Sequence, residues 1–180
     1  MGFLELVAGR RSIRKYKNAP VEPEKLARCI EAARLAPSAC NSQPWKYIAV
    51  TDTSVRDRLA AEAFNGIYKA TQFAAAAPVI VAVAADKGNF TARIGNFVRH
   101  TSFYLIDIGI SAENFCLQAA EEGLGTCMIG WFDEKKAARV LGVPAGVKLE
   151  LLIAVGYPDE APAPRPRKTV DEMSTFNAYR

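Results

Sequence analysis

The segment TSFYLIDIGISAENFCLQAAEE, residues 101–122, is the longest periodic stretch of the chain and decides its fold. Phe103, Ile106 and Ile110 recur at helical spacing, which predicts a helix with one apolar side. The other side is apolar as well, and it carries Leu105, Ile108, Ala112, Phe115, Cys116 and Ala119. A helix that is apolar around most of its circumference must be buried on most sides. A subunit interface is one source of that cover.

The remaining elements alternate irregularly around this helix. Further helices are expected over 3–9, 23–34, 55–63 and 133–141, and strands over 45–50, 79–83, 126–131 and 147–155. The run VIVAV at residues 79–83 is apolar without alternation, which predicts a strand buried on both faces. Because helices and strands follow no regular βαβ order, the expected class is α+β, in one domain over residues 1–180.

Composition excludes several classes of protein. Hydrophobic residues make up 50% of the chain and charged residues 23%, which is typical of a globular domain. The net charge of +4 is modest, so no nucleic-acid partner is expected. The longest apolar run, residues 73–85, is interrupted by Pro78 and is too short to span a membrane. With four scattered cysteines and one histidine, no metal site is expected, and the absence of a secretory signal pattern favours a cytoplasmic location.

Two basic strings lie near the chain ends. The arginine string is RRSIR at residues 10–14, and the second string is RPRK at residues 165–168. Guanidinium groups bind phosphate oxygens in pairs, so the two strings are candidates for one anion site. The alternative for the first string is that it neutralises the C-terminal end of a short helix, and the alternative for the second is simple solvation.

The second basic string belongs to a proline-rich C-terminal arm, residues 157–180. Four prolines between residues 157 and 168 favour an extended path that is able to wrap a neighbouring subunit. Apolar residues beyond them, Val170, Met173 and Phe176, indicate that the end docks on a surface. A disordered tail is the alternative.

A third string, APSACNSQPW at residues 36–45, contains what we call the amide loop, residues 37–44. Pro37 and Pro44 exclude a helix between them, and the small side chains allow a ligand to approach closely. Asn41 and Gln43 offer both donors and acceptors, which suits the edge of a flavin. The alternative is an ordinary turn that caps its own backbone.

Together with GLGTCMIGWF at residues 123–132, these strings resemble the nitroreductase family of FMN-dependent oxidoreductases. They occur in the order typical of that family and cover almost the whole chain. The resemblance implies an α+β fold with a mixed central β-sheet flanked by helices. It also implies an intertwined homodimer with two flavins at the interface and with the arm packed on the partner subunit.

The resemblance further implies roles for individual residues. The FMN phosphate is expected to be held by Arg10, Arg165 and Arg167, with Arg11 and Ser12 near the ribityl chain and Arg14 beside N1 and O2 of the ring. The residues expected to reach the flavin from the partner subunit are Pro37, Ser38, Ala39, Asn41 and Gln43. Ile129 and Gly130 are expected to pass their backbone near N5. Lys69 or Gln72 would supply the polar pyrimidine contact of larger family members.

The implied activity is ping-pong hydride transfer from NADH or NADPH, through flavin N5, to an electron-poor small molecule such as a nitroaromatic or a quinone. No catalytic side chain is required, because the cofactor carries the chemistry. Two alternatives remain open: another reaction on the same scaffold, such as dehalogenation, dehydrogenation or flavin fragmentation, and a low-turnover FMN-binding or sensor protein. The residues that would distinguish them are expected over 64–71 and 86–100, which include His100.

Overall fold

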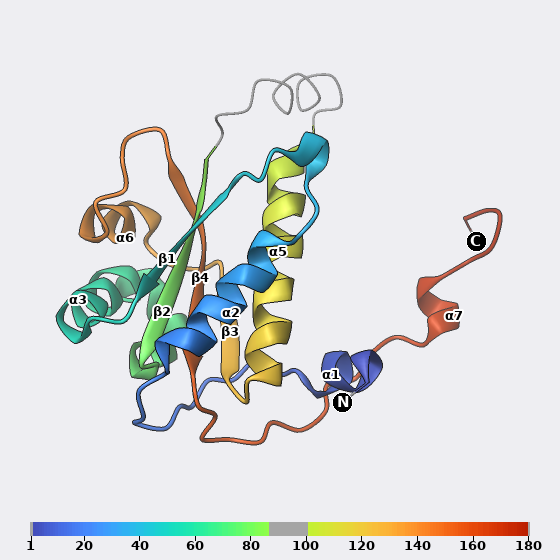
Figure 1. Cartoon of the computed structure of the whole chain (residues 1–180), viewed down its shortest axis with the longest axis horizontal. Coiled ribbons are helices and arrows are strands. Elements are labelled where there is room, and N and C mark those ends of the chain that lie inside the picture. Colours follow the sequence, from blue (N-terminus) through green and yellow to red (C-terminus); the bar gives the residue numbers. More distant parts are fainter. Residues whose placement is uncertain (1, 87–100, 180) are drawn as a thin grey trace.

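The structure is a computed structural model of the 180-residue chain, and it describes residues 2–86 and 101–179. Within these residues four strands form one sheet in the order β1-β2-β4-β3 (Figure 1). The strands are β1 (Trp45–Val50), β2 (Val79–Ala85), β3 (Gly125–Ile129) and β4 (Lys148–Gly156). No helix in the described ranges is long and apolar enough to cross a bilayer. The segment 87–100, including His100, lies outside the described residues.

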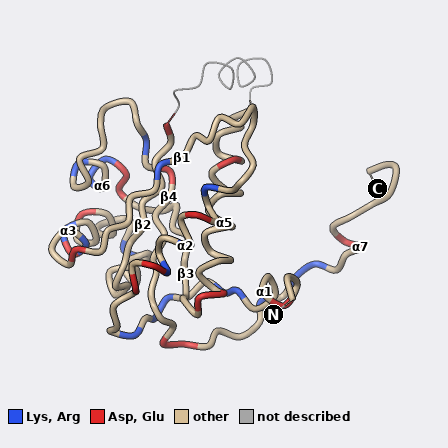
Figure 2. The backbone as a smooth tube through the Cα atoms, in the orientation of Figure 1, with Lys and Arg blue, Asp and Glu red and all other residues tan. Residues whose placement is uncertain are grey.

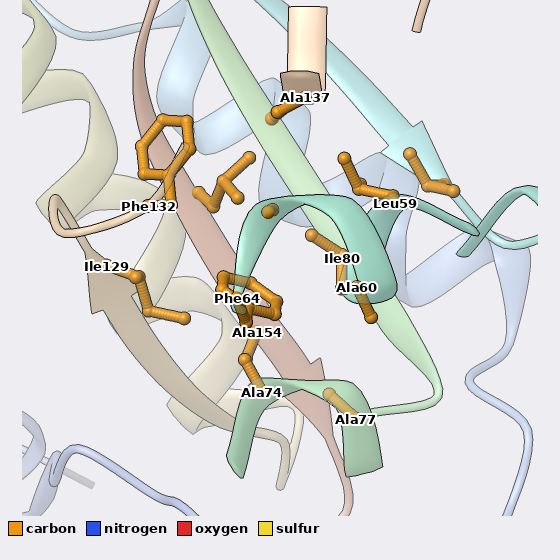
Figure 3. Packing of buried hydrophobic residues seen from close by; sticks show 14 of the residues in the cluster. Leu59, Ala60, Phe64, Ala74, Ala77, Ile80, Ile129, Phe132, Ala137 and Ala154 are labelled. Carbon is orange, nitrogen blue, oxygen red and sulfur yellow. The ribbon is translucent and has the colours of Figure 1, made fainter. Parts of the chain in front are cut away.

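Helices cover both faces of the sheet (Figure 1). One face packs against α2 (Pro23–Arg34) and α5 (Phe103–Glu121). The other face packs against α3 (Thr53–Ala63), the 3-10 segment η2 (Gly66–Ala76) and α6 (Glu134–Val140). Figure 3 shows Phe64, Ala74 and Ala137 among the buried side chains of this second face. Two short helices, α1 (Phe3–Gly9) and α7 (Val170–Met173), and one 3-10 turn, η1 (Ala39–Asn41), complete the described elements.

Strand β2 separates the two cores. All seven of its residues are buried, as expected from the unbroken apolar run. Ile80, Ala82 and Ala84 face the α3 side, and the alternate residues Val79, Val81, Val83 and Ala85 face the α2 and α5 side. Because successive side chains of a strand point to opposite faces, this one strand contributes to both cores.

The α+β class is confirmed, but the sheet of this chain differs from the mixed sheet that was expected. All three strand pairings are antiparallel. Between β1 and β2 the chain makes two helical passes, α3 and η2, and so re-enters the sheet at the end where β1 finishes. A single crossover helix would have produced a parallel pair. Among the described residues, the parallel pairing is the isolated bridge between Ser12 and Thr126.

Local signals explain most element boundaries. Pro23 occupies the first turn of α2, where its missing N–H is not needed. Asp52 caps α3 by accepting the N–H of Val55 at 2.9 Å, and Asp133 caps α6 through the N–H of Lys136 at 3.1 Å. The expected helices and strands are therefore present, with ends shifted by two residues or fewer.

Helix α5 is buried on one side and exposed to solvent on the other. Ile108, Ala112 and Phe115 face the core, whereas Ile106 is 53% exposed and Leu105 44% exposed. The prediction that this helix is covered on most sides is therefore not met within one chain.

The end of the C-terminal arm is also exposed: α7 stands apart from the body in Figure 1, and Phe176 is 87% exposed. In this chain the arm has no helix or strand from residue 159 to 169, and its residues are exposed from 163 to 179.

Candidate flavin site

The arginine string lies along the edge of β3. Helix α1 ends at Gly9, and the Arg10 N–H closes its last turn by donating to Leu6 O at 2.9 Å. The Ile13 N–H then donates to Thr126 O at 2.9 Å, beside the Ser12 bridge to the same residue. Close packing fixes this register, because a Cβ on Gly125 would lie 2.6 Å from Ile13 Cγ1. Glycine at position 125 therefore permits the string to approach the strand.

The start of the arm pairs with the other side of the same segment. The Lys17 N–H donates to Tyr157 O at 2.9 Å, and the Asp159 N–H donates to Lys15 O at 3.0 Å. An antiparallel bridge joins Tyr16 to Pro158. Residues 10–17 thus lie between β3 and the arm, and two ends of the sequence become neighbours.

One arginine from each basic string acts electrostatically on Cys127 of β3. Burial raises the pKa of this thiol, and the charges of Arg14 and Arg165, together with a hydrogen bond from Ser12, act in the opposite direction. Arg14 comes from the first string and Arg165 from the second. Figure 2 shows the same pattern along the backbone, with basic segments beside α1 and just before α7. One chain therefore brings together cations from both of its ends.

The arginines differ in how many of their guanidinium N–H groups already donate hydrogen bonds within the chain. The Arg11 Nη1 donates to Ala8 O and to Arg10 O, so this side chain neutralises the end of α1. The Arg10 Nε lies 2.9 Å from Glu113 Oε1 but is buried without a well-formed hydrogen bond. Arg14 and Arg167 are exposed, and each donates a single 3.4 Å hydrogen bond, to Ser12 O and Pro166 O respectively. The helix-end alternative thus describes the contacts of Arg11, whose expected place near the ribityl chain stays a prediction. Arg10, Arg14 and Arg167 retain donors for an anion.

The amide loop has a strained backbone. Cys40, Asn41 and Gln43 have φ angles of 53°, 51° and 44°, in the left-handed region that non-glycine residues rarely adopt. Internal hydrogen bonds hold this shape, because the Gln43 N–H donates to Ser38 Oγ at 2.9 Å and Gln43 Nε2 donates to Asn41 Oδ1 at 3.1 Å. The self-capping alternative is thus part of the structure. Strain of this kind is typical of ligand-binding loops, where the surrounding contacts must maintain it.

Asp107 ties the amide loop to α5. Its Oδ1 accepts the Ala39 N–H at 3.1 Å, and the residue is only 5% exposed. Its Oδ2 is buried without a hydrogen-bond partner in the described part of the chain. Asp107 is not among the site residues expected from the sequence, although an acidic side chain inside the apolar stretch FYLIDIGISA is a visible signal.

The expected site residues fall into two groups. Arg10 and Arg11 line a pocket of about 410 Å³ at the C-terminal end of α5, together with Thr126 and Glu160. The amide loop lies at the opposite end of α5 (Figure 1). Pro37 is exposed there, and Ser38 is half-buried. The string, the arm and β3 therefore meet in one chain, but the loop does not join them.

The remaining candidates lie at the end of β3 and on η2. Ile129 is buried at the end of β3, and the exposed Gly130 after it has open space where a Cβ would project. Lys69 and Gln72 are both exposed on η2, so the structure does not choose between them. In the described ranges no group of His, Cys, Asp and Glu side chains is arranged to hold a metal ion.

The donor set fits a phosphorylated flavin better than a metal. Guanidinium groups with unused N–H donors suit phosphate oxygens, and Arg14 and Arg167 each donate a single 3.4 Å hydrogen bond. The exposed backbone at Gly130 admits a flat ring at close range. The donors near β3 thus suit a phosphate and Gly130 leaves room for a flat ring, whereas the amide loop lies at the far end of α5.

Comparisons with known proteins agree with this geometry. The family model described as "Nitroreductase family" matches residues 7–157. A relative from Streptococcus pyogenes, whose name places it with the NAD(P)H nitroreductases, is 32% identical over 96% of this chain and 98% of its own length. Two solved structures, each 30% identical, cover 98% of this chain and 100% of their own. A nitroreductase family protein from Streptococcus pneumoniae superposes with a TM-score of 0.83, and an FMN-dependent nitroreductase from Clostridium difficile with 0.80. The chain therefore belongs to the nitroreductase family.

Proposed function

We propose that this protein is an FMN-dependent oxidoreductase that takes hydride from NADH or NADPH and delivers it to an electron-poor acceptor such as a nitroaromatic or a quinone. The observation that carries the proposal is the pairing of the arginine string with β3 on one side and with the start of the arm on the other, in a chain similar to an FMN-dependent nitroreductase. When bound, FMN supplies the hydride acceptance and donation, and the protein supplies binding and orientation.

Different arginines of the two basic strings would contact different parts of the cofactor. Arg10, Arg165 and Arg167 would bind the phosphate, and Arg14 would lie by N1 and O2, where a cation favours the anionic reduced ring. Two ionisable side chains near Arg14, those of Tyr16 and Cys127, add no opposing negative charge. Burial raises the pKa of Tyr16 far above its usual value and also raises that of Cys127, so both side chains stay neutral.

A second subunit would complete the site. The amide loop is preformed but lies at the other end of α5, so it would serve the flavin of a partner. The bare side of α5 and the exposed α7 supply apolar surface for such a homodimer, since exposed apolar patches of this kind mark interaction sites. The cysteines of the described structure are free thiols, which supports our expectation of a cytoplasmic enzyme.

A flat acceptor would have room beside Gly130. A pocket of about 590 Å³ opens there, and Tyr68 and Trp131 lie on its wall with ring centroids 5.2 Å apart. Trp131 is anchored through its Nε1, which donates to Ile67 O at 3.0 Å. An aromatic wall of this kind suits stacking with a nitroaromatic or quinone ring.

Anaerobic reduction of the purified protein tests the proposal. FMN is added to saturation, and the visible flavin absorbance is followed after addition of NADH or NADPH, and then of a nitroaromatic or a quinone. We expect bleaching by at least one donor and recovery by at least one acceptor. Absence of bleaching with both donors would favour the FMN-storage or sensor alternative. Failure to bind FMN at all would overturn the whole proposal.

A further inference from the structure

Resting on this proposed function, we propose that Glu160 is a positioning residue for the phosphate site. Its carboxylate joins the arginine string to the arm and so fixes the two basic strings relative to each other. Glu160 would not contact the cofactor, and its effect would pass through the arginines that it holds in place.

The contacts of Glu160 are made with backbone atoms. Its Oε1 accepts the N–H of Arg14 at 2.5 Å and the N–H of Lys15 at 3.2 Å. These two donors follow the Ile13 N–H, which is already used by Thr126. A carboxylate that accepts backbone N–H groups forms stronger hydrogen bonds than a neutral acceptor does. The string is therefore held by β3 at Ile13 and by the arm at the next two residues.

The arrangement leaves the Arg14 charge free. No ion pair within the described ranges joins Glu160 to an arginine, and the Arg14 guanidinium instead lies 5.6 Å from the centre of the Phe73 ring. Had the carboxylate paired with the guanidinium, it would have neutralised the cation that an anionic ligand needs. Glu160 thus fixes the position of the Arg14 backbone without occupying its side chain.

Glu160 also limits where the second basic string can go. It lies in the wall of the 410 Å³ pocket beside Arg10 and Arg11. Arg165 follows five residues later, so the extended chain between them spans at most roughly 17 Å. Burial dominates the raised pKa of Cys127, and Glu160 adds to that rise while Arg14 and Arg165 oppose it. All three charges therefore act on the same small region of β3.

The neighbouring Asp159 provides a matched control. It is an exposed acidic residue on the same segment, and it contacts the string through its backbone N–H, which donates to Lys15 O. Removing its side chain changes the local charge by the same amount as removing that of Glu160. It leaves the hydrogen bonds to Arg14 and Lys15 intact.

The test compares Glu160→Ala, Glu160→Gln and Asp159→Ala by two measurements. The first is amide hydrogen exchange at Arg14 and Lys15 in the FMN-free protein, with Val81 in the buried β2 as a control for global unfolding. The second is the affinity for FMN and for riboflavin, which lacks the phosphate. In Glu160→Ala we expect faster exchange at both amides but not at Val81, and about tenfold weaker FMN binding with a smaller loss for riboflavin. Glu160→Gln, which keeps an acceptor oxygen, should recover part of both effects, and Asp159→Ala should resemble the wild type.

Unchanged exchange at Arg14 and Lys15 in Glu160→Ala would overturn the proposal. So would faster exchange with unchanged FMN affinity, or equal losses for FMN and riboflavin, because each would reduce Glu160 to a structural residue. If the wild type bound neither flavin, the proposed function would fail, and with it the positioning role. The exchange data would still show whether Glu160 holds the N–H groups of Arg14 and Lys15.

Discussion

The arginine string and the amide loop are expected to contact the same cofactor, yet the chain holds them in opposite ways. The string is fixed on both sides within its own chain, by β3 through Ile13 and by the arm through Glu160. The loop is strained and is tied to the body by Asp107 near the start of α5. The difference teaches that one chain fixes a cationic region and a preformed amide loop at separate places, which we call the cationic half and the amide half of the proposed site.

The largest expected effect comes from removing the arm's contribution to the cationic half. In the double variant Arg165→Ala with Arg167→Ala, two charged phosphate contacts are lost, each worth about 1.5–3 kcal/mol. FMN titration should show the combined loss. Arg58→Ala, an exposed arginine on α3, is the control and should bind FMN normally. Unchanged FMN affinity in the double variant would place the arm away from the phosphate.

The next effect concerns the packing of the arginine string against β3. In Gly125→Ala the new Cβ would lie 2.6 Å from Ile13 Cγ1 and 2.8 Å from Ile13 Cβ, so the string must shift. We expect a loss of about 1–3 kcal/mol in the free energy of unfolding, measured with urea on FMN-free protein, and weaker FMN binding. Gly130→Ala, whose Cβ would meet no atom within 4 Å, should unfold like the wild type. Equal stability of both variants would show that the arginine string is not closely packed against Gly125.

A smaller effect is expected at the amide half. Asp107→Ala leaves the Ala39 N–H without its acceptor, and we expect FMN binding to weaken by about 1.5 kcal/mol as the loop relaxes. Asp107→Asn keeps an acceptor oxygen and should restore most of that affinity. Ser111→Ala is the control, because this buried residue on the same helix bonds Ala33 O rather than the loop. If Ser111→Ala weakened FMN binding as much as Asp107→Ala, general destabilisation would explain both.

The smallest effect separates the two halves by thiol reactivity. Cys40 is exposed in the amide loop, whereas burial raises the pKa of Cys29 and Cys116 to about 12 and that of Cys127 above its usual range. Because the thiolate is the reactive form, alkylation at mildly alkaline pH should label Cys40 first. The buried thiols should begin to react only as the pH rises toward their raised pKa values. FMN should slow the labelling of Cys40, and a rate independent of FMN would contradict contact between the loop and the cofactor.

Short-range signals in the sequence were enough to predict most of the fold. Pro23 and Pro44 mark the starts of α2 and β1, and the apolar run at β2 identifies the central strand. Segment η2 was missed, because an alanine-rich 3-10 stretch has no period of 3.6 residues to detect. The direction of strand pairing was also missed, since it depends on how many helical passes the chain makes between strands.

The candidate site shows the same limit. The basic strings and the amide loop carry recognisable residue patterns, so the sequence alone is enough to identify them as candidates. Asp107 and Glu160 were not, because their partners lie 68 and up to 146 residues away in the sequence. A single acidic residue predicts no contact until the fold places a backbone N–H beside it.

Subunit complementation tests the central claim most directly. One tagged chain carries Arg165→Ala with Arg167→Ala, a second carries Asp107→Ala with Asn41→Ala, and the heterodimer is purified through both tags after co-expression. If each flavin is bound by the cationic half of one subunit and the amide half of the other, the heterodimer contains one intact site. We predict FMN binding at one site per heterodimer with wild-type affinity, and strongly weakened binding by both variant homodimers. A heterodimer in which both sites are as weak as in the homodimers would show that the two halves act within one chain, and would contradict the account.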